Sequence, residues 1–194
     1  MTPLAIDPQE SALVLIDLQQ GIVGRPWAPR TGPEVVQHAA RLAARFRELG
    51  ATVVLVRVAY HPDGKDALNA PADVAAPFNP AALPPAWADL APELGPQPGD
   101  LIITKRQWGA FHGTELDLQL RRRGVRTIIL GGIATNIGVE STARSAHEHG
   151  YAQILVEDAM AGGSAELHDF AVKNIFPRLG RVRSTAAVLA ALAS

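Results

Sequence analysis

Residues 128–143 read IILGGIATNIGVESTA, an apolar run of strand length that passes through two glycines into the start of a helix. Gly131 and Gly132 permit close packing or unusual backbone angles at this junction. A helix start presents unpaired backbone N–H groups, which suit an anion or a developing oxyanion. A plain strand-to-helix turn with a Thr or Asn cap would have the same pattern. We therefore expect a strand, a tight turn and a helix here, and the turn is a candidate place for chemistry.

Apolar runs of strand length alternate with helix-length segments on both sides of this junction. The expected strands are residues 12–16, 52–58, 101–104, 127–130, 153–156 and 180–183, and the expected helices are residues 34–49, 115–123, 136–149, 165–176 and 184–192. Such alternation is typical of a parallel sheet with crossover helices. It predicts an α/β fold, a three-layer α/β/α Rossmann-like, doubly wound arrangement on a mostly parallel six-stranded sheet. The ligand site of such a fold lies at the carboxyl ends of the strands.

One long segment interrupts the alternation. Prolines and alanines recur throughout residues 61–99, where Trp87, Leu90 and Leu94 could still form a short helix. We interpret this segment as an ordered loop excursion. Loops of this length often carry binding function.

Length and composition limit the class of protein. The 194 residues are 47% hydrophobic, which suits a single domain spanning residues 1–194. A net charge of -1 leaves no large basic face, so we expect no nucleic acid or membrane partner and favour a small-molecule substrate. No apolar run approaches the ~20 residues of a membrane span, and a cytoplasmic protein is expected. Because cysteine is absent, disulfides, thiolate metal sites and thiol catalysis are excluded.

Two charged residues stand at strand ends. Asp17 follows a fully apolar strand, so its carboxyl should be partly desolvated, which favours a raised pKa and a role as acid or base. A helix or turn cap is the alternative for this residue. Lys105 ends the strand over residues 101–104, and alone it would be read as a solvated charge. At the same sheet edge as Asp17, it becomes a candidate partner for the carboxylate.

Four segments together resemble the isochorismatase-like family, also called the cysteine hydrolase superfamily, over nearly the whole chain. They are VLIDLQ at residues 14–19, TKRQWGAF at 104–111, GGIATNIGV at 131–139, and residues 141–151. The resemblance implies the strand order 3-2-1-4-5-6 and a catalytic Asp-Lys-Cys triad. Asp17 and Lys105 match two of its members, and Gly138 occupies the cysteine position. The family's backbone oxyanion hole, with a cis peptide bond, would fall at Ile133-Ala134 and at the Gly138 amide.

The glycine at position 138 directs the expected chemistry. Amidases of the family attack with a thiolate, which this chain lacks, whereas true isochorismatases also have glycine there. The resemblance to these implies hydrolysis of a vinyl ether: the Asp protonates the methylene carbon, water adds to the oxocarbenium ion, and the hemiketal collapses to release pyruvate. Asp17 would be the general acid/base, and Lys105 would orient it and balance its charge.

The resemblance also bears on cofactors and substrate contacts. Where related nicotinamidases have an Asp-x-His metal motif, this chain has Ala59-Tyr60-His61, so neither a metal nor another cofactor is expected. His61 could instead lie at the pocket rim as a substrate contact, or be a surface histidine. Gln107 replaces an arginine of the isochorismatase pattern, which weakens the case for a dicarboxylate substrate.

Further residues are candidates for contact with the substrate. The remaining substrate-binding candidates are Gln19, Ile22, Trp108, Phe111 and Asn136, although apolar residues in such positions are more often simple core packing. A hydroxyl could in principle replace the thiol, at Ser141 or Thr135. Neither occupies the nucleophile position and no histidine is evident as a base, so we interpret Thr135 as a cap and Ser141 as a small packing residue.

Three functions remain open from the sequence. The first is a cofactor-free hydrolase of the isochorismatase type acting on a small metabolite. The second is a small-molecule-binding paralogue with reduced catalysis, and the third is an amidase-like hydrolase that uses water without a thioester. The resemblance further implies a homo-oligomer, to which the apolar C-terminal helix and the Pro-rich loop could contribute an interface.

Overall fold

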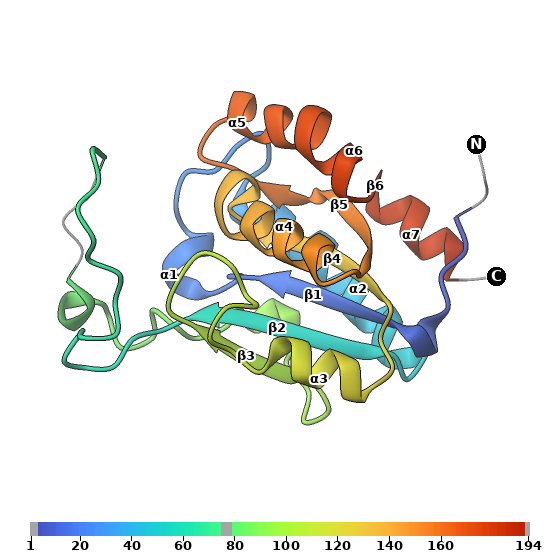
Figure 1. Ribbon diagram of the computed structural model, residues 1–194, viewed down its shortest axis with the longest axis horizontal. Helices are drawn as coiled ribbons and strands as arrows, with labels where there is room; N and C mark the ends of the chain where they lie inside the picture. The colour runs from blue at the N-terminus through green and yellow to red at the C-terminus, as the bar shows by residue number, and fades with distance from the viewer. Residues whose placement is uncertain (1–3, 75–78, 193–194) are drawn as a thin grey trace.

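The computed structural model describes residues 4–74 and 79–192, and its centre is one all-parallel six-stranded sheet (Figure 1). The strand order is β3-β2-β1-β4-β5-β6, as the family resemblance implied. The strands are β1 Ser11–Ile16, β2 Thr52–Val58, β3 Leu101–Lys105, β4 Thr127–Ile133, β5 Ala152–Ala161 and β6 Arg181–Arg183. All six match expected strands, and the predicted α/β fold class is confirmed.

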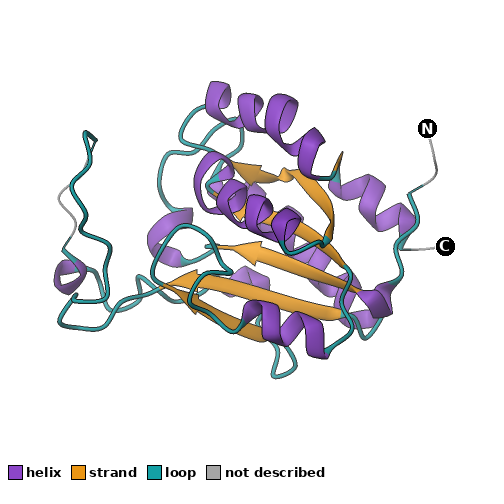
Figure 2. Cartoon of the chain, in the orientation of Figure 1, coloured by secondary structure: helices purple, strands orange, loops and turns teal. Residues whose placement is uncertain are grey.

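Helices cover both faces of the sheet (Figure 2). They are α1 Gln20–Val23, α2 Gly32–Glu48, α3 Leu116–Arg122, α4 Glu140–Glu148, α5 Ala165–Phe170, α6 Phe176–Leu179 and α7 Thr185–Ala191. Helix α2 begins with a capping box in which the Thr31 hydroxyl and the Glu34 carboxylate each accept a backbone N–H. Within the described residues, no helix combines the length and apolar character needed to cross a bilayer.

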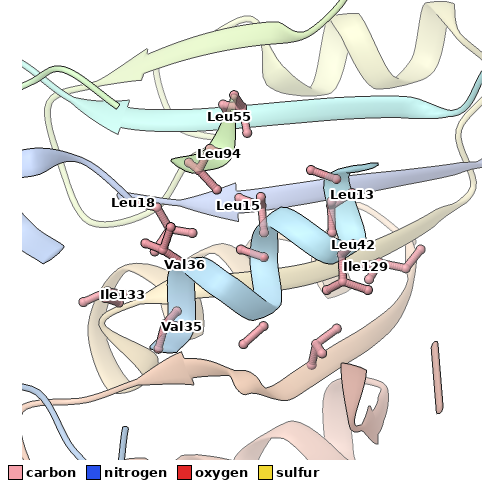
Figure 3. Close-up of a cluster of buried hydrophobic side chains, with 14 of the residues drawn as sticks. Leu13, Leu15, Leu18, Val35, Val36, Leu42, Leu55, Leu94, Ile129 and Ile133 are labelled. Carbon is pink, nitrogen blue, oxygen red and sulfur yellow. The ribbon is translucent and has the colours of Figure 1, made fainter. Parts of the chain in front are cut away.

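The core has two parts because successive side chains of β1 point to opposite faces of the sheet. Leu13 and Leu15 pack toward α2 with Leu42, as Figure 3 shows. Val14 and Ile16 lie in the other cluster, and all of these side chains are buried. Each such residue contributes about 1.5–3 kcal/mol through burial. The interior strand β1 therefore has a hydrophobic side chain at nearly every position.

Glycine is required where β4 meets β1. Gly132 has a φ of 122°, and a Cβ there would lie 2.2 Å from the Ile16 carbonyl oxygen. The strand continues to Ile133, beyond the expected end at residue 130, and the chain then forms a π-helical turn over Thr135–Val139 that leads directly into α4. The expected helix over residues 136–149 thus exists, but its first turn is wound more widely than an α-helix.

The Pro-rich segment leaves the sheet at the carboxyl end of β2 and stands away from the layers, at the left of Figure 1. Residues 75–78 of it lie outside the described part of the chain. The segment returns to the body at Trp87, whose carbonyl accepts the Gly21 N–H at 3.1 Å, and the Ala91 N–H donates to the Leu18 carbonyl at 2.9 Å. The residues around Trp87 form turns, and a 3-10 helix follows at Pro92–Leu94.

Candidate active site

A cavity of about 250 Å³ lies at the carboxyl ends of the central strands. This volume is near the lower limit of the roughly 300–1,000 Å³ usual for ligand pockets, which suits a small metabolite. The lining residues come from the ends of β1 to β4, from α1 and the loop after it, from the returning Pro-rich segment, and from the π-helical turn. They are Asp17, Ile22, Arg25, Trp27, Val58, Tyr60, Trp87, Lys105, Trp108, Ile133, Ala134, Ile137 and Gly138.

Asp17 and Lys105 form a buried ion pair in this cavity. Asp17 follows β1 and Lys105 ends β3, so the two side chains meet across the end of β2. The Lys105 Nζ atom lies 2.7 Å from Asp17 Oδ2 and also donates to the Gln107 carbonyl at 3.0 Å. The Asp17 side chain is only 8% exposed, and the Lys105 side chain only 2%. The expected pairing of these two residues is therefore observed.

The surroundings of Asp17 favour its protonated form. Burial raises the pKa of the carboxyl to about 6, although the ammonium of Lys105 acts in the opposite direction. Asp17 Oδ1 is buried and has no hydrogen-bond partner among the described residues. The backbone of Asp17 has a positive φ of 54°, which is uncommon outside glycine. This is a carboxyl group that can hold a proton in mildly acidic solution and has one buried oxygen without a hydrogen-bond partner in the described part of the chain.

Gly138 lies beside this carboxyl group. A Cβ at position 138 would lie 3.3 Å from Asp17 Oδ2 and 3.1 Å from Ile16 Cγ2, so even a methyl group would be crowded. The Ile133-Ala134 peptide bond is cis, as the resemblance implied. Ala134 and Gly138 both line the cavity, at the two ends of the turn expected to form the oxyanion hole.

Aromatic rings form much of the cavity wall. All three tryptophans of the chain, Trp27, Trp87 and Trp108, line it together with Tyr60. Only Trp108 had been expected there. Trp27 and Trp87 lie in loops far apart in sequence, so no local pattern marks them as neighbours. Ile22, another of the apolar candidates, lines the cavity as expected.

Gln19 supports this wall from behind rather than lining it. Its side chain is fully buried; Nε2 donates to the carbonyls of Val58 and Trp87, and Oε1 accepts the Val58 N–H. These bonds fix the end of β2 to the returning Pro-rich segment. Gly21 lets the returning Pro-rich segment lie close to α1, because a Cβ at position 21 would lie 2.0 Å from the Trp87 ring.

Three other expected substrate contacts lie away from the cavity lining. The His61 side chain is 67% exposed and pairs with Asp63 at 2.9 Å. Phe111 is buried in the core, where its ring stacks on His149 at 5.0 Å between centroids. Asn136 follows the cis bond, but its side-chain oxygen is buried and lies next to Gly162. Their positions give no support to direct contact with a substrate.

Thr135 is not the helix cap that the sequence suggested, because the N-terminal capping position belongs to Ala134. The Thr135 hydroxyl instead lies 2.8 Å from Nδ1 of His168, a histidine that sequence reasoning had not identified. Burial lowers the pKa of His168, which favours the neutral ring. Thr135 is completely buried and does not line the cavity, so this pair cannot supply a nucleophile to it.

Gln107 has a structural use. Its Nε2 donates to the carbonyls of Gly109 and His112, at 3.0 and 2.6 Å, and so closes the loop after β3. Among residues 4–74 and 79–192, no three His, Asp or Glu side chains gather in a way that could hold a metal ion.

The chain is similar to known proteins in sequence and in fold. The Isochorismatase domain model matches residues 11–187. An isochorismatase family protein of Bacillus subtilis, YwoC, is 51% identical over 95% of both chains, and the ureidoacrylate amidohydrolase RutB of Methylorubrum extorquens is 32% identical over 99% of this chain and 86% of its own. The structure of an isochorismatase family protein from Burkholderia thailandensis superposes with a TM-score of 0.94 at 49% identity, covering 100% of both chains. This chain belongs to the isochorismatase family and is a hydrolase.

Proposed function

We propose that this protein hydrolyses a vinyl ether in a small metabolite without a cofactor, with Asp17 as the general acid. The proposal rests chiefly on one observation. Asp17 is a buried carboxyl group with a pKa raised to about 6, its Oδ1 atom has no hydrogen-bond partner among the described residues, and it lines a cavity whose turn has glycine, not a nucleophile, at position 138.

The reaction needs one proton and one water. The Asp17 carboxyl group gives its proton to the methylene carbon of the vinyl ether, and the electrons of the double bond form the new C–H bond. Water adds to the resulting oxocarbenium carbon and returns a proton to the Asp17 carboxylate. The hemiketal then breaks its C–O bond, and its hydroxyl proton ends on the leaving oxygen, which releases an alcohol and a ketone. Lys105 balances the carboxylate charge at the stage when Asp17 is ionised.

Pyruvate release from isochorismate tests this function, with lactate dehydrogenase coupling as the readout. We expect turnover by the native protein and a loss of at least about 100-fold in Asp17→Asn, in line with the usual contribution of general acid catalysis. Asp169→Asn is the matched control, because Asp169 is an exposed carboxylate that pairs with Lys173 on its own helical stretch, not with a residue of the cavity. Turnover that survives in Asp17→Asn would refute the acid role. Ligand binding without turnover would favour the paralogue with reduced catalysis.

A second candidate is an amidase-like hydrolysis in which water attacks directly. Two observations favour it: the relative RutB is named an amidohydrolase, and Ala134 and Gly138 line the cavity as the expected oxyanion hole. Ammonia release from a panel of small ureido and amide compounds distinguishes the two candidates. Ammonia release, with isochorismate left intact, would support the amidase.

We also propose that the chain assembles as a homo-oligomer. The segment after β2 exposes Leu68 and Val74, at 73% and 96%, while standing away from the layers (Figure 1). Exposed apolar side chains on a protruding segment are suited to packing against another copy. Light scattering after size exclusion should give a multiple of the 20.6 kDa chain mass. A mass of one chain at micromolar concentration would contradict this assembly.

A further inference from the structure

Three charged side chains line the cavity, and only two of them compensate each other. Asp17 and Lys105 form the buried ion pair, whereas Arg25 is an exposed residue of the lining and has no carboxylate partner in the described part of the chain. Its Nε atom donates to the Gly21 carbonyl at 3.1 Å. A guanidinium has five N–H donors, so the donors on its two terminal nitrogens remain for a ligand. Two neighbouring N–H donors in the plane of a guanidinium match the two oxygens of a carboxylate.

The position of Arg25 is defined by the turn that precedes it. The backbone N–H groups of Gln20 and Gly21 donate to the carbonyls of Asp89 and Trp87, which joins α1 to the returning Pro-rich segment. Trp27 Nε1 donates to the Ile22 carbonyl at 2.7 Å, so its ring is held by the same turn. Arg25 and two of the tryptophans are thus arranged around one short helix.

The aromatic walls define the shape of the ligand, and the cations define its charge. Trp27, Trp87 and Trp108 line the cavity, and indole rings favour a planar, unsaturated body over a bulky aliphatic one. A cationic ligand, which aromatic rings alone could attract, would be opposed by Arg25 and Lys105. When Asp17 is protonated, both cations are uncompensated and the cavity favours an anion.

We propose that Arg25 is the specificity-determining residue of the cavity, binding the carboxylate of a flat, unsaturated substrate whose body lies against the tryptophan rings. This assignment rests on the proposed function, since it names the class of substrate presented to Asp17. Arg25 acts in binding and takes no part in proton transfer.

The tryptophans themselves supply the assay. Because all three line the cavity, their fluorescence reports its occupancy directly. Benzoate and benzamide are matched flat probes that differ in charge. We expect benzoate to change the emission with a dissociation constant at least about tenfold below that of benzamide, and added salt to reduce this preference.

Substitutions assign the preference to one side chain. Arg25→Gln should bind both probes equally, and Arg25→Lys should recover part of the preference for benzoate. Arg122→Gln, which changes an exposed arginine on α3, should behave as the native protein. With a vinyl ether carboxylate as substrate, Arg25→Gln should raise KM at least about tenfold and leave kcat nearly unchanged.

Equal binding of benzoate and benzamide by the native protein, no emission change with either, or a benzoate preference that persists in Arg25→Gln would overturn the assignment. The two proposals can fail separately. Benzoate selectivity without pyruvate release would refute the vinyl ether reaction alone. Pyruvate release with an unchanged KM in Arg25→Gln would refute the role of Arg25 alone.

Discussion

The two carboxyl oxygens of Asp17 have unlike surroundings. Oδ2 accepts from Lys105 at 2.7 Å, while Oδ1 has no partner in the described part of the chain. Burial and the lysine have opposite effects on the pKa, and burial has the larger one. The apolar strand before Asp17 made desolvation predictable from the sequence. The free oxygen was not predictable, because it depends on what every neighbouring loop leaves unpaired.

Removing the lysine charge should therefore alter the acid in a known direction. In Lys105→Met the pKa of Asp17 should rise further, because the opposing positive charge is gone and burial remains. The decline of kcat/KM with rising pH should begin at a higher pH than in the native protein. Lys173→Met, which removes an exposed lysine, is the control. An unchanged pH profile in Lys105→Met would contradict the coupling.

Gly138 provides a second test at the residue scale. In Gly138→Ala the new methyl group would lie within 3.1 Å of Ile16 Cγ2 and 3.3 Å of Asp17 Oδ2, and crowding of this kind costs typically 1–3 kcal/mol. We expect a lower denaturation midpoint together with weaker turnover. Gly163→Ala is the matched control, since nothing lies within 4 Å of a Cβ there. If both variants behave alike in denaturation and turnover, the crowding has no effect.

Among the elements, the junction of β4 with the following helix contributes most to the cavity. Its sequence predicted a strand, two glycines and a helix start, and these are present. The π-helical winding of Thr135–Val139 was not predicted, because the turn packs between β4 and α5 and local propensity does not define such a winding. The hydrogen bond of Thr135 was not predictable either, because its partner His168 is remote in sequence.

Gly132 tests the close approach of β4 to β1. In Gly132→Ala the Cβ would lie 2.2 Å from the Ile16 carbonyl oxygen, in addition to the cost of a positive φ. We expect a loss of at least about 2 kcal/mol in the free energy of unfolding, measured by denaturant titration. Gly150→Ala also has a positive φ, of 81°, but open space around its Cβ. Gly150→Ala should therefore lower the free energy of unfolding less than Gly132→Ala does, because its Cβ meets no neighbouring atom. Equal losses in the two variants would refute the close contact.

Across the whole molecule, parallel strand ends bring distant residues to one edge. The alternating pattern of strands and helices predicted this edge as the ligand site and made Lys105 a candidate partner of Asp17, and the family resemblance supplied the strand order. Trp27, Trp87 and Arg25 were missed, because loops with no regular period carry them into the cavity. His61 was expected at the rim as an alternative to the surface, and the structure has it on the surface, in the segment after β2 that stands away from the layers (Figure 1).

The acid role of Asp17 is tested most directly by the pH dependence of kcat/KM for vinyl ether hydrolysis. With a pKa raised to about 6, Asp17 carries its proton below that pH and loses it above. The account predicts a plateau in the acid range and a decline above about pH 6 that approaches tenfold per pH unit. A value of kcat/KM that is constant between pH 5 and pH 8, or that increases with pH, would contradict it.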